Sequence, residues 1–165
     1  MGQAFVWIGI LAWMVIAFGL RRHWDTVTLL VLGELSEIAV AFSKTLFDRA
    51  RPLPFVGDQF AGVDVGSYPS GHVTRVLITL GVLALYATPR GWRPAAMALA
   101  ALTVAVMAVA RVAVLEHWLT DTLGGVLLGA AWLALLGATA TFMGRSTGRT
   151  GPTTRSRDDA PATRG

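Results

Sequence analysis

Three short segments of the chain contain side-chain types that can bind and cleave a phosphate ester. Residues 44–52 read KTLFDRARP, residues 69–72 read PSGH, and residues 111–121 read RVAVLEHWLTD. Together they supply lysine and arginine cations, two imidazoles, a hydroxyl, a glycine amide and a carboxylate. Cations bind phosphate oxygens, and imidazoles serve as nucleophiles or as proton donors and acceptors. These segments are therefore the candidate site.

The cations and the second segment suit the binding of phosphate oxygens. Arg51 and Arg111 can each form two parallel hydrogen bonds to a phosphate, while Lys44 contributes a point charge. Ser70 and Gly71 are expected to begin a helix, because an apolar run follows them. The free N–H groups and the positive dipole end of such a helix bind anions. Gly71 has no Cβ, so a phosphate can approach the backbone closely there.

Two histidines and an aspartate could carry the bond-making steps. His117 and Asp121 are four residues apart, so they share a face if this segment is helical. A carboxylate on one ring nitrogen fixes the tautomer and leaves the other nitrogen as a nucleophile. His72 is then available as general acid and base. A purely structural His117–Asp121 pair, and a pairing of Arg111 with Glu116, are the alternative interpretations.

In chain order these residues form the pattern K-x6-R-P, P-S-G-H and R-x5-H-x3-D. This pattern resembles the three-part signature of the type 2 phosphatidic acid phosphatase family, which shares its site with the vanadium-dependent haloperoxidases. The chain has ten of the eleven fixed residues, and the departure is Ala110, where the family has serine. By this resemblance the change would remove one auxiliary phosphate contact and none of the central groups.

The resemblance implies a role for each residue. His117 would attack phosphorus and form a phosphohistidine, His72 would protonate the leaving oxygen and then activate water, and Asp121 would orient His117. The residues that would hold the phosphate oxygens are Lys44, Arg51, Ser70, Gly71 and Arg111. The sequence offers no carboxylate cluster for Mg²⁺, so we expect turnover without a metal or another cofactor.

The composition limits the class of protein that can position these segments. Of 165 residues, 54% are hydrophobic and 15% are charged, whereas a soluble domain has about 25% charged residues. This balance argues against a soluble protein and against disorder. The chain has no cysteine, which excludes a disulfide scaffold. The net charge of +4 does not indicate nucleic-acid binding, because most arginines lie between apolar runs and are not clustered on a polar face.

Five apolar stretches predict five transmembrane helices: residues 3–20, 26–47, 73–88, 94–114 and 122–143. The third is short and gains a turn if its helix begins near Ser70. We therefore expect an all-α, integral-membrane bundle. Residues 1–143 would form the phosphatase domain, with a family core of about 26–143, and residues 144–165 a disordered cytoplasmic tail. Members of the family usually have six helices, so either this is a compact variant or its start site was assigned too late.

The distribution of basic residues predicts the orientation. Residues 21–25, residues 89–93 and the tail hold nine of the 14 lysines and arginines. Five alternating spans would place all three segments on one side of the membrane. The positive-inside rule assigns that side to the cytoplasm, so the candidate site faces the other side.

The leading hypothesis is a cell-membrane phosphatase that acts on a lipid phosphate. The substrate could be phosphatidic acid, phosphatidylglycerol phosphate or a polyprenyl diphosphate, and the expected partners are that substrate and membrane lipids, with no nucleic acid. A catalytically silent scaffold or transporter component that retains the site is the alternative. A vanadate-dependent haloperoxidase is disfavoured, because those enzymes are large and soluble. The oligomeric state stays open.

Four charged residues near the motifs have no role in the signature. Glu34 and Glu37 lie on one helical face inside an apolar stretch, where they could form a packing pair, a proton path or a headgroup contact. Arg75, one turn after His72, could contact the substrate, but we favour an outward direction to the membrane surface. Arg49 is expected to pair with Asp48 at an exposed position.

Overall fold

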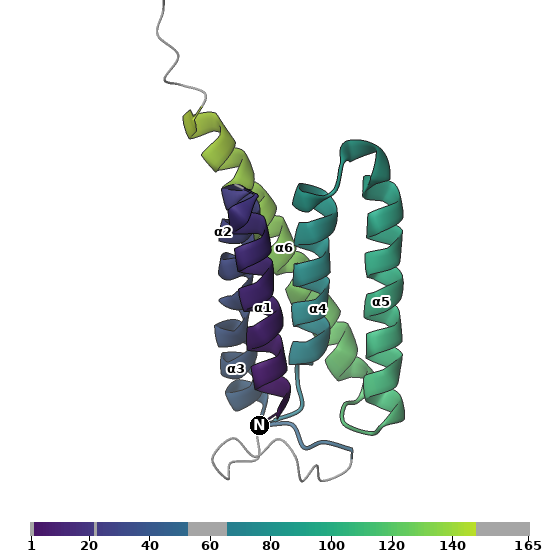
Figure 1. Ribbon diagram of the computed structural model, residues 1–165. Helices are drawn as coiled ribbons and strands as arrows, with labels where there is room; N and C mark the ends of the chain where they lie inside the picture. The colour runs from purple at the N-terminus through teal and green to yellow at the C-terminus, as the bar shows by residue number, and fades with distance from the viewer. Residues whose placement is uncertain (1, 22, 53–65, 148–165) are drawn as a thin grey trace, which may run out of the picture.

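The described part of the chain, residues 2–21, 23–52 and 66–147, is a bundle of helices with no strand among these residues in this computed structural model (Figure 1). The elements are α1 (Gly2–Leu20), α2 (Trp24–Glu34), α3 (Ser36–Phe47), α4 (Gly71–Val82), η1 (Leu83–Ala87), η2 (Arg90–Trp92), α5 (Arg93–Ala113) and α6 (Leu119–Thr147). The prediction of an all-α fold is confirmed.

Each predicted apolar stretch is helical. The helix expected near Ser70 begins at Gly71 and continues through the π-helical turn η1 to Ala87. The last helix, α6, extends to Thr147, beyond the predicted end at residue 143. Residues 148–165 of the predicted tail lie outside the described residues, as do residues 53–65, which follow the first motif.

The second stretch is divided into α2 and α3 at Leu35. The N–H of Leu35 donates to the carbonyl of Leu32, three residues earlier, with an N···O distance of 3.2 Å. The indole Nε1 of Trp132 on α6 also donates to that carbonyl, at 3.2 Å. A side chain that bonds to a main-chain carbonyl in this way interrupts the regular helical ladder. The break therefore depends on a distant tryptophan, and the two helices still follow one another as a single span.

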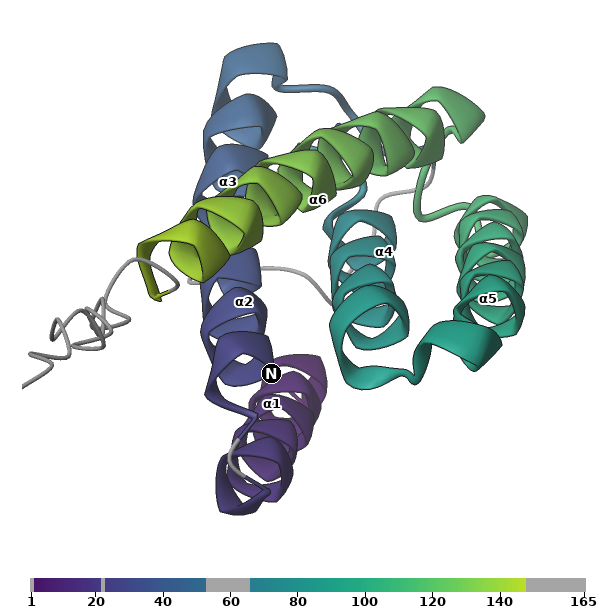
Figure 2. The same ribbon diagram turned by 90° about the horizontal axis from the view of Figure 1, so that it is seen from above.

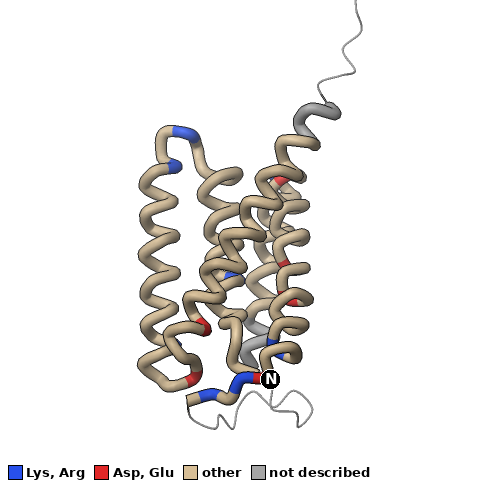
Figure 3. Tube along the Cα trace, turned by 180° about the vertical axis from the view of Figure 1, so that it is seen from behind, with Lys and Arg blue, Asp and Glu red and all other residues tan. Residues whose placement is uncertain are grey.

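The outside of the bundle suits a membrane. Three helical runs are long and apolar enough to cross one, Trp24–Phe47, Arg90–Ala113 and Leu119–Phe142, and two shorter apolar helices accompany them. Many of the exposed side chains are large and apolar. The charged residues of α5 are Arg93 at its start and Arg111 in its last turn, and Figure 3 shows the middle of this helix without charged residues. Lipid tails solvate such a surface, whereas water would not. The predicted integral-membrane bundle is confirmed.

Helix α4 lies at the centre of the bundle and packs against α2, α3, α5 and α6. Val73 and Val82 of α4 are fully buried, and each belongs to one of two apolar core clusters. Figure 2 shows α4 between α3 and α5, with α6 crossing the bundle diagonally. The helix that begins at the PSGH motif is therefore held by neighbours on several sides.

Two glycines let α6 approach the backbone of α4. A Cβ on Gly125 would lie 2.6 Å from the carbonyl oxygen of Ser70, and one on Gly129 would lie 3.2 Å from that of Thr74. The hydroxyl of Thr74 donates to the carbonyl of Gly125 at 3.1 Å. Small residues spaced by four allow such close helix packing in membranes. This contact brings the start of α6 next to the start of α4.

We predict that Gly125→Ala lowers the free energy of unfolding by about 1–3 kcal/mol, because the added methyl group meets a main-chain carbonyl that cannot move without displacing α4. Thermal unfolding of the purified protein in detergent measures the effect. Gly9→Ala is the matched control, since nothing lies within 4 Å of a Cβ at that helical glycine. Equal midpoints for the two variants would contradict the packing argument.

Candidate functional site

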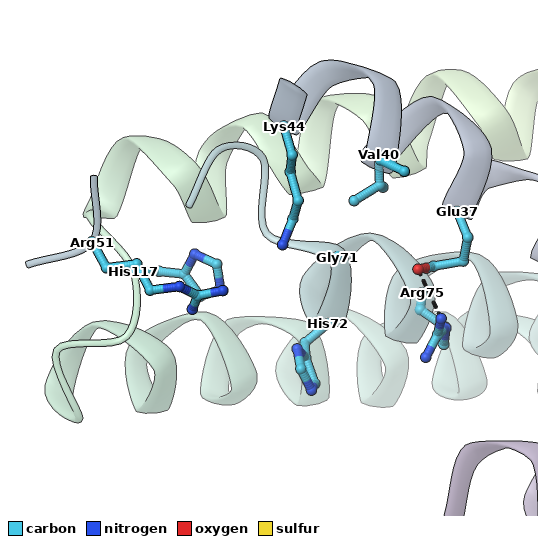
Figure 4. A pocket seen from close by; sticks show the side chains of 9 residues that line it. Glu37, Val40, Lys44, Arg51, Gly71, His72, Arg75 and His117 are labelled. Atoms are coloured by element: carbon cyan, nitrogen blue, oxygen red, sulfur yellow. Dashed lines mark ion pairs between the residues drawn. The ribbon is translucent and has the colours of Figure 1, made fainter. Parts of the chain in front are cut away.

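The three sequence motifs meet at one end of the bundle, around a cavity of about 230 Å³ between α3, α4 and the turn that precedes α6 (Figure 4). The residues that line it are Glu37, Val40, Ala41, Lys44, Arg51, Gly71, His72, Arg75 and His117. Figure 4 shows Lys44 extending from α3 toward Gly71, with Arg51 beside His117. Cations and imidazoles from different motifs therefore face the same space.

The first motif turns sharply after Lys44. Helix α3 ends at Phe47, and Asp48 takes a left-handed conformation with φ of 37°, while its N–H donates to the Lys44 carbonyl at 3.0 Å. The chain then runs toward the third motif, where Nη1 of Arg51 donates to the carbonyl of Glu116 at 3.1 Å. The N–H of Ser67 donates to the Arg49 carbonyl at 2.7 Å. These bonds keep Arg51 at the rim of the cavity.

The second motif forms the first turn of α4. Ser70 is the N-cap residue, is fully buried, and donates its N–H to the carbonyl of Asp121 at 2.9 Å. Its Oγ has no hydrogen-bond partner among the described residues. Gly71 follows and lines the cavity, so the positive end of the α4 dipole faces this space. A Cβ at Gly71 would lie 3.3 Å from Val40, which explains why a larger residue would narrow the cavity.

The third motif folds back under the end of α5. The N–H groups of Glu116 and His117 both donate to the carbonyl of Arg111, at 3.2 and 3.3 Å. Leu115 permits this reversal with φ of 58°. The guanidinium of Arg111 pairs with the carboxylate of Glu116, and Arg111 does not line the cavity. The alternative pairing suggested by the sequence is therefore the one observed.

His117 and Asp121 lie close together, but they do not share a face of one helix. His117 precedes α6, which begins at Leu119. Asp121 reaches back from the first turn, and its Oδ2 accepts a hydrogen bond from the N–H of Trp118 at 2.8 Å. Its Oδ2 lies 3.6 Å from Nδ1 of His117, and both side chains are buried. Helix capping, not helical periodicity, creates the pair.

His117 is held in its neutral form. Burial and the positive charges of Arg51 and Lys44 lower the pKa of His117 to about 4, while the Asp121 carboxylate opposes them. The ring therefore takes up a proton only as the pH falls through about 4, below its ordinary value of 6.5. At neutral pH its lone pair remains available. A neutral imidazole among cations is suited to attack an electrophile that carries negative oxygens.

The structure brings most of the predicted residues together. Five of them, Lys44, Arg51, Gly71, His72 and His117, line the cavity. Ser70 and Asp121 do not line it; both are fully buried, and they contact one another through the main chain. Arg111 lies in the last turn of α5, where Glu116 engages it.

Two of the sequence-based expectations were wrong. Arg49 pairs with Asp121 and not with Asp48, because its Nη1 lies 2.9 Å from Oδ1 of Asp121. Arg75 does not extend outward: its Nη2 lies 2.8 Å from Oε2 of Glu37, and it lines the cavity. Gly71 and Arg75 are four residues apart in α4, so the sequence already indicated that they share one face of this helix.

Glu34 and Glu37 form an interhelical network with that arginine. Nε of Arg75 lies 3.6 Å from Oε2 of Glu34, and its guanidinium lies over the Trp7 ring of α1, 5.4 Å from the centroid. Arg75 thus connects α4 to α1, α2 and α3. These contacts fit the interpretation of the two glutamates as a packing pair, because polar contacts hold membrane helices together.

Comparison with known proteins identifies similar chains. A profile described as the PAP2 superfamily matches residues 24–145. An undecaprenyl-diphosphatase of Sulfolobus acidocaldarius is 29% identical over 144 residues, which cover 82% of this chain and 63% of that protein. The present chain thus spans less than two thirds of the relative's length.

A solved structure shows the same fold. The crystal structure of the first transmembrane PAP2 type phosphatidylglycerolphosphate phosphatase from Bacillus subtilis matches with a TM-score of 0.66 and 21% identity. The match covers 87% of this chain and 71% of that chain. The apolar helices and this shared architecture identify a multi-pass membrane protein.

We predict that Arg51→Met raises the pKa of His117 from about 4, because it removes the positive charge that lowers this pKa most. Asp121→Asn should lower the pKa further, because it removes the negative charge that raises it. Histidine NMR of the labelled protein in detergent measures the titration, with the His117 signal assigned from His117→Ala. Arg90→Met is the control. Arg90 is exposed and lies in η2, just before α5, so its replacement should leave the titration of His117 unaltered. A His117 midpoint near 6.5 in the unsubstituted protein would contradict this electrostatic account.

Proposed function

The chain belongs to the PAP2 superfamily, and on that basis we propose that it is an integral-membrane phosphatase that hydrolyses a phosphate monoester or diphosphate of a lipid. One observation carries the proposal: the three motifs place Lys44, Arg51, Gly71, His72 and His117 around one cavity. The cations and the start of α4 are suited to hold phosphate oxygens, and the imidazoles to perform the chemistry.

In the proposed mechanism His117 is the nucleophile. Its Nδ1 is turned to Asp121, which leaves Nε2 to attack phosphorus in line. The new N–P bond forms as the ester P–O bond breaks, and His72 gives its proton to the leaving lipid oxygen. Water then attacks the phosphohistidine and passes a proton to His72, so that the N–P bond breaks and phosphate leaves. Both histidines return to their starting states.

Positive charge would stabilise the transition state. Lys44 and Arg51 line the cavity beside His117, and Ser70 and the Gly71 amide stand at the start of α4. Preorganised donors of this kind usually make the largest contribution to such catalysis. Arg111 would join them when a phosphate competes with Glu116 for its guanidinium. The chain's own groups account for each proton and each charge, so we expect turnover without a metal.

A lipid substrate fits the surroundings of the site. The cavity lies at one end of a bundle whose outer side chains are largely apolar, so a phosphate could bind at that end while its lipid tail stays in the bilayer. One relative is named for undecaprenyl diphosphate and the structural relative for phosphatidylglycerolphosphate. We therefore propose phosphatidylglycerol phosphate, a polyprenyl diphosphate or phosphatidic acid as the substrate.

The proposed orientation places the site on the non-cytoplasmic face of the cell membrane. Figure 3 shows basic residues at both ends of the bundle. Arg21, Arg90 and Arg93 belong to the connections remote from the cavity, where the positive-inside rule favours the cytoplasm. The basic residues at the other end are the cations of the site and its surroundings, so a function in phosphate binding explains why they depart from that rule. The tail would then be cytoplasmic.

We predict that His117→Ala lowers phosphate release by at least about 1,000-fold, because no other group replaces the nucleophile. The assay uses purified protein in detergent with EDTA and three substrates: short-chain phosphatidic acid, phosphatidylglycerol phosphate and farnesyl diphosphate. His23→Ala is the matched control, since His23 lies before α2, away from the cavity.

Two results would count against the proposal. One is equal phosphate release by His117→Ala and the unsubstituted protein. The other is loss of activity in EDTA that added divalent cations restore.

A further inference from the structure

Arg49 makes contacts that the three-part signature does not require. Its Nη1 donates to Oδ1 of Asp121 at 2.9 Å and also to the hydroxyl of Thr120. Its guanidinium lies over the ring of Trp118, 5.5 Å from the centroid. The side chain of Arg49 is 39% exposed, whereas that of Asp121 is fully buried. An arginine at the protein surface thus reaches a buried carboxylate behind the cavity.

The two oxygens of Asp121 have separate partners. Arg49 engages Oδ1, while the N–H of Trp118 donates to Oδ2 at 2.8 Å. Oδ2 is also the oxygen that lies 3.6 Å from Nδ1 of His117. Two contacts on opposite oxygens fix the plane of a carboxylate, so they set the direction in which Oδ2 faces the imidazole. Without Arg49, the carboxylate could turn about its bond to Cβ.

The main chain around Arg49 is itself held in place. Ser67 donates to the Arg49 carbonyl at 2.7 Å, and Nε1 of Trp118 donates to the Ala50 carbonyl at 3.0 Å. The main chain of Asp121 accepts the hydrogen bond from Ser70. These hydrogen bonds hold the main chain from which Arg49 extends, and residues of all three motifs contact Asp121.

We propose that Arg49 is a positioning residue that acts on His117 through Asp121. The inference rests on the proposed function, because it assigns a role within that reaction. Arg49 holds the carboxylate so that it orients the imidazole, keeps the proton on Nδ1 and stabilises the ring as positive charge develops in the transition state. Groups that orient the histidine ligands of metal sites typically contribute about 10- to 100-fold, and we expect an effect of similar size here. Arg49 extends the His117–Asp121 pair to a third member.

A purely structural role for Arg49 makes different predictions. If the residue only fastened residues 44–52 to the start of α6, its loss would loosen the cavity and weaken the binding of phosphate. A positioning role leaves binding intact and slows the chemical step. It also requires Asp121, so the effects of removing Arg49 and Asp121 must not multiply.

The test compares Arg49→Met, Arg49→Lys, Asp121→Asn and the double variant Arg49→Met with Asp121→Asn, each as the full chain in detergent. Thr120→Val is the matched control, because it removes the other hydrogen bond of Arg49 and leaves Asp121 untouched. Phosphate release from phosphatidic acid, phosphatidylglycerol phosphate and farnesyl diphosphate gives kcat and KM. Thermal unfolding shows whether each variant is folded, and Arg49→Lys is the milder change.

We expect Arg49→Met to lower kcat about 10- to 100-fold with KM changed by less than about twofold. Arg49→Lys should recover part of the loss, because it keeps a cation near Oδ1, and Thr120→Val should be close to the unsubstituted protein. In the Asp121→Asn background, Arg49→Met should lower kcat by less than about threefold. A full multiplicative loss in the double variant, or a rise in KM with kcat unchanged, would overturn the inference.

A second readout does not need activity. In ¹⁵N-histidine NMR, the His117 signals report which ring nitrogen carries the proton. The inference requires Arg49→Met to reduce the population with the proton on Nδ1, as Asp121→Asn does. His117 signals in Arg49→Met that match those of the unsubstituted protein would overturn it. If no substrate is hydrolysed even by the unsubstituted protein, the proposed function fails, while this spectrum still decides whether Arg49 acts on His117.

Discussion

The hydrogen bond from the Ser70 N–H to the Asp121 carbonyl joins the starts of α4 and α6, and the geometry of the whole site depends on it. One of these helices presents an anion-binding N-terminus, and the other carries the carboxylate beside His117. Gly125 makes the approach possible, because a Cβ at that position would overlap the Ser70 carbonyl. Main-chain packing between α4 and α6 therefore determines how far the first turn of α4 lies from the imidazole of His117.

The electrostatics of the site follow from that approach. Burial and neighbouring cations keep His117 neutral, and the same cations are placed to attract a phosphate. In the proposed mechanism the positive charges would serve two purposes, since they would bind the phosphate and keep the nucleophile, His117, neutral. The Asp121 carboxylate raises the pKa of His117, but burial and the cations of Arg51 and Lys44 outweigh it. Such a balance suits an imidazole that becomes positively charged only during the reaction.

Much of this arrangement could be predicted from the sequence, because it depends on local pattern. The apolar runs predicted the helices, and Ser70 followed by Gly71 predicted the start of α4. Contacts between distant segments could not be predicted in this way. The break at Leu35 depends on Trp132, and Arg49 reaches Asp121, which is 72 residues away. The His117–Asp121 contact was expected for the wrong reason, since capping of α6 brings the two together in place of a shared helical face.

The central claim is that His117 bonds covalently to phosphorus. Rapid acid-free quenching of a single turnover, followed by peptide mass spectrometry, tests it most directly. The account predicts phosphate on the peptide that contains His117, with a longer-lived phosphopeptide in His72→Ala, where water is no longer activated. Release of phosphate with no phosphopeptide in either protein, or phosphate attached to a different residue, would contradict it.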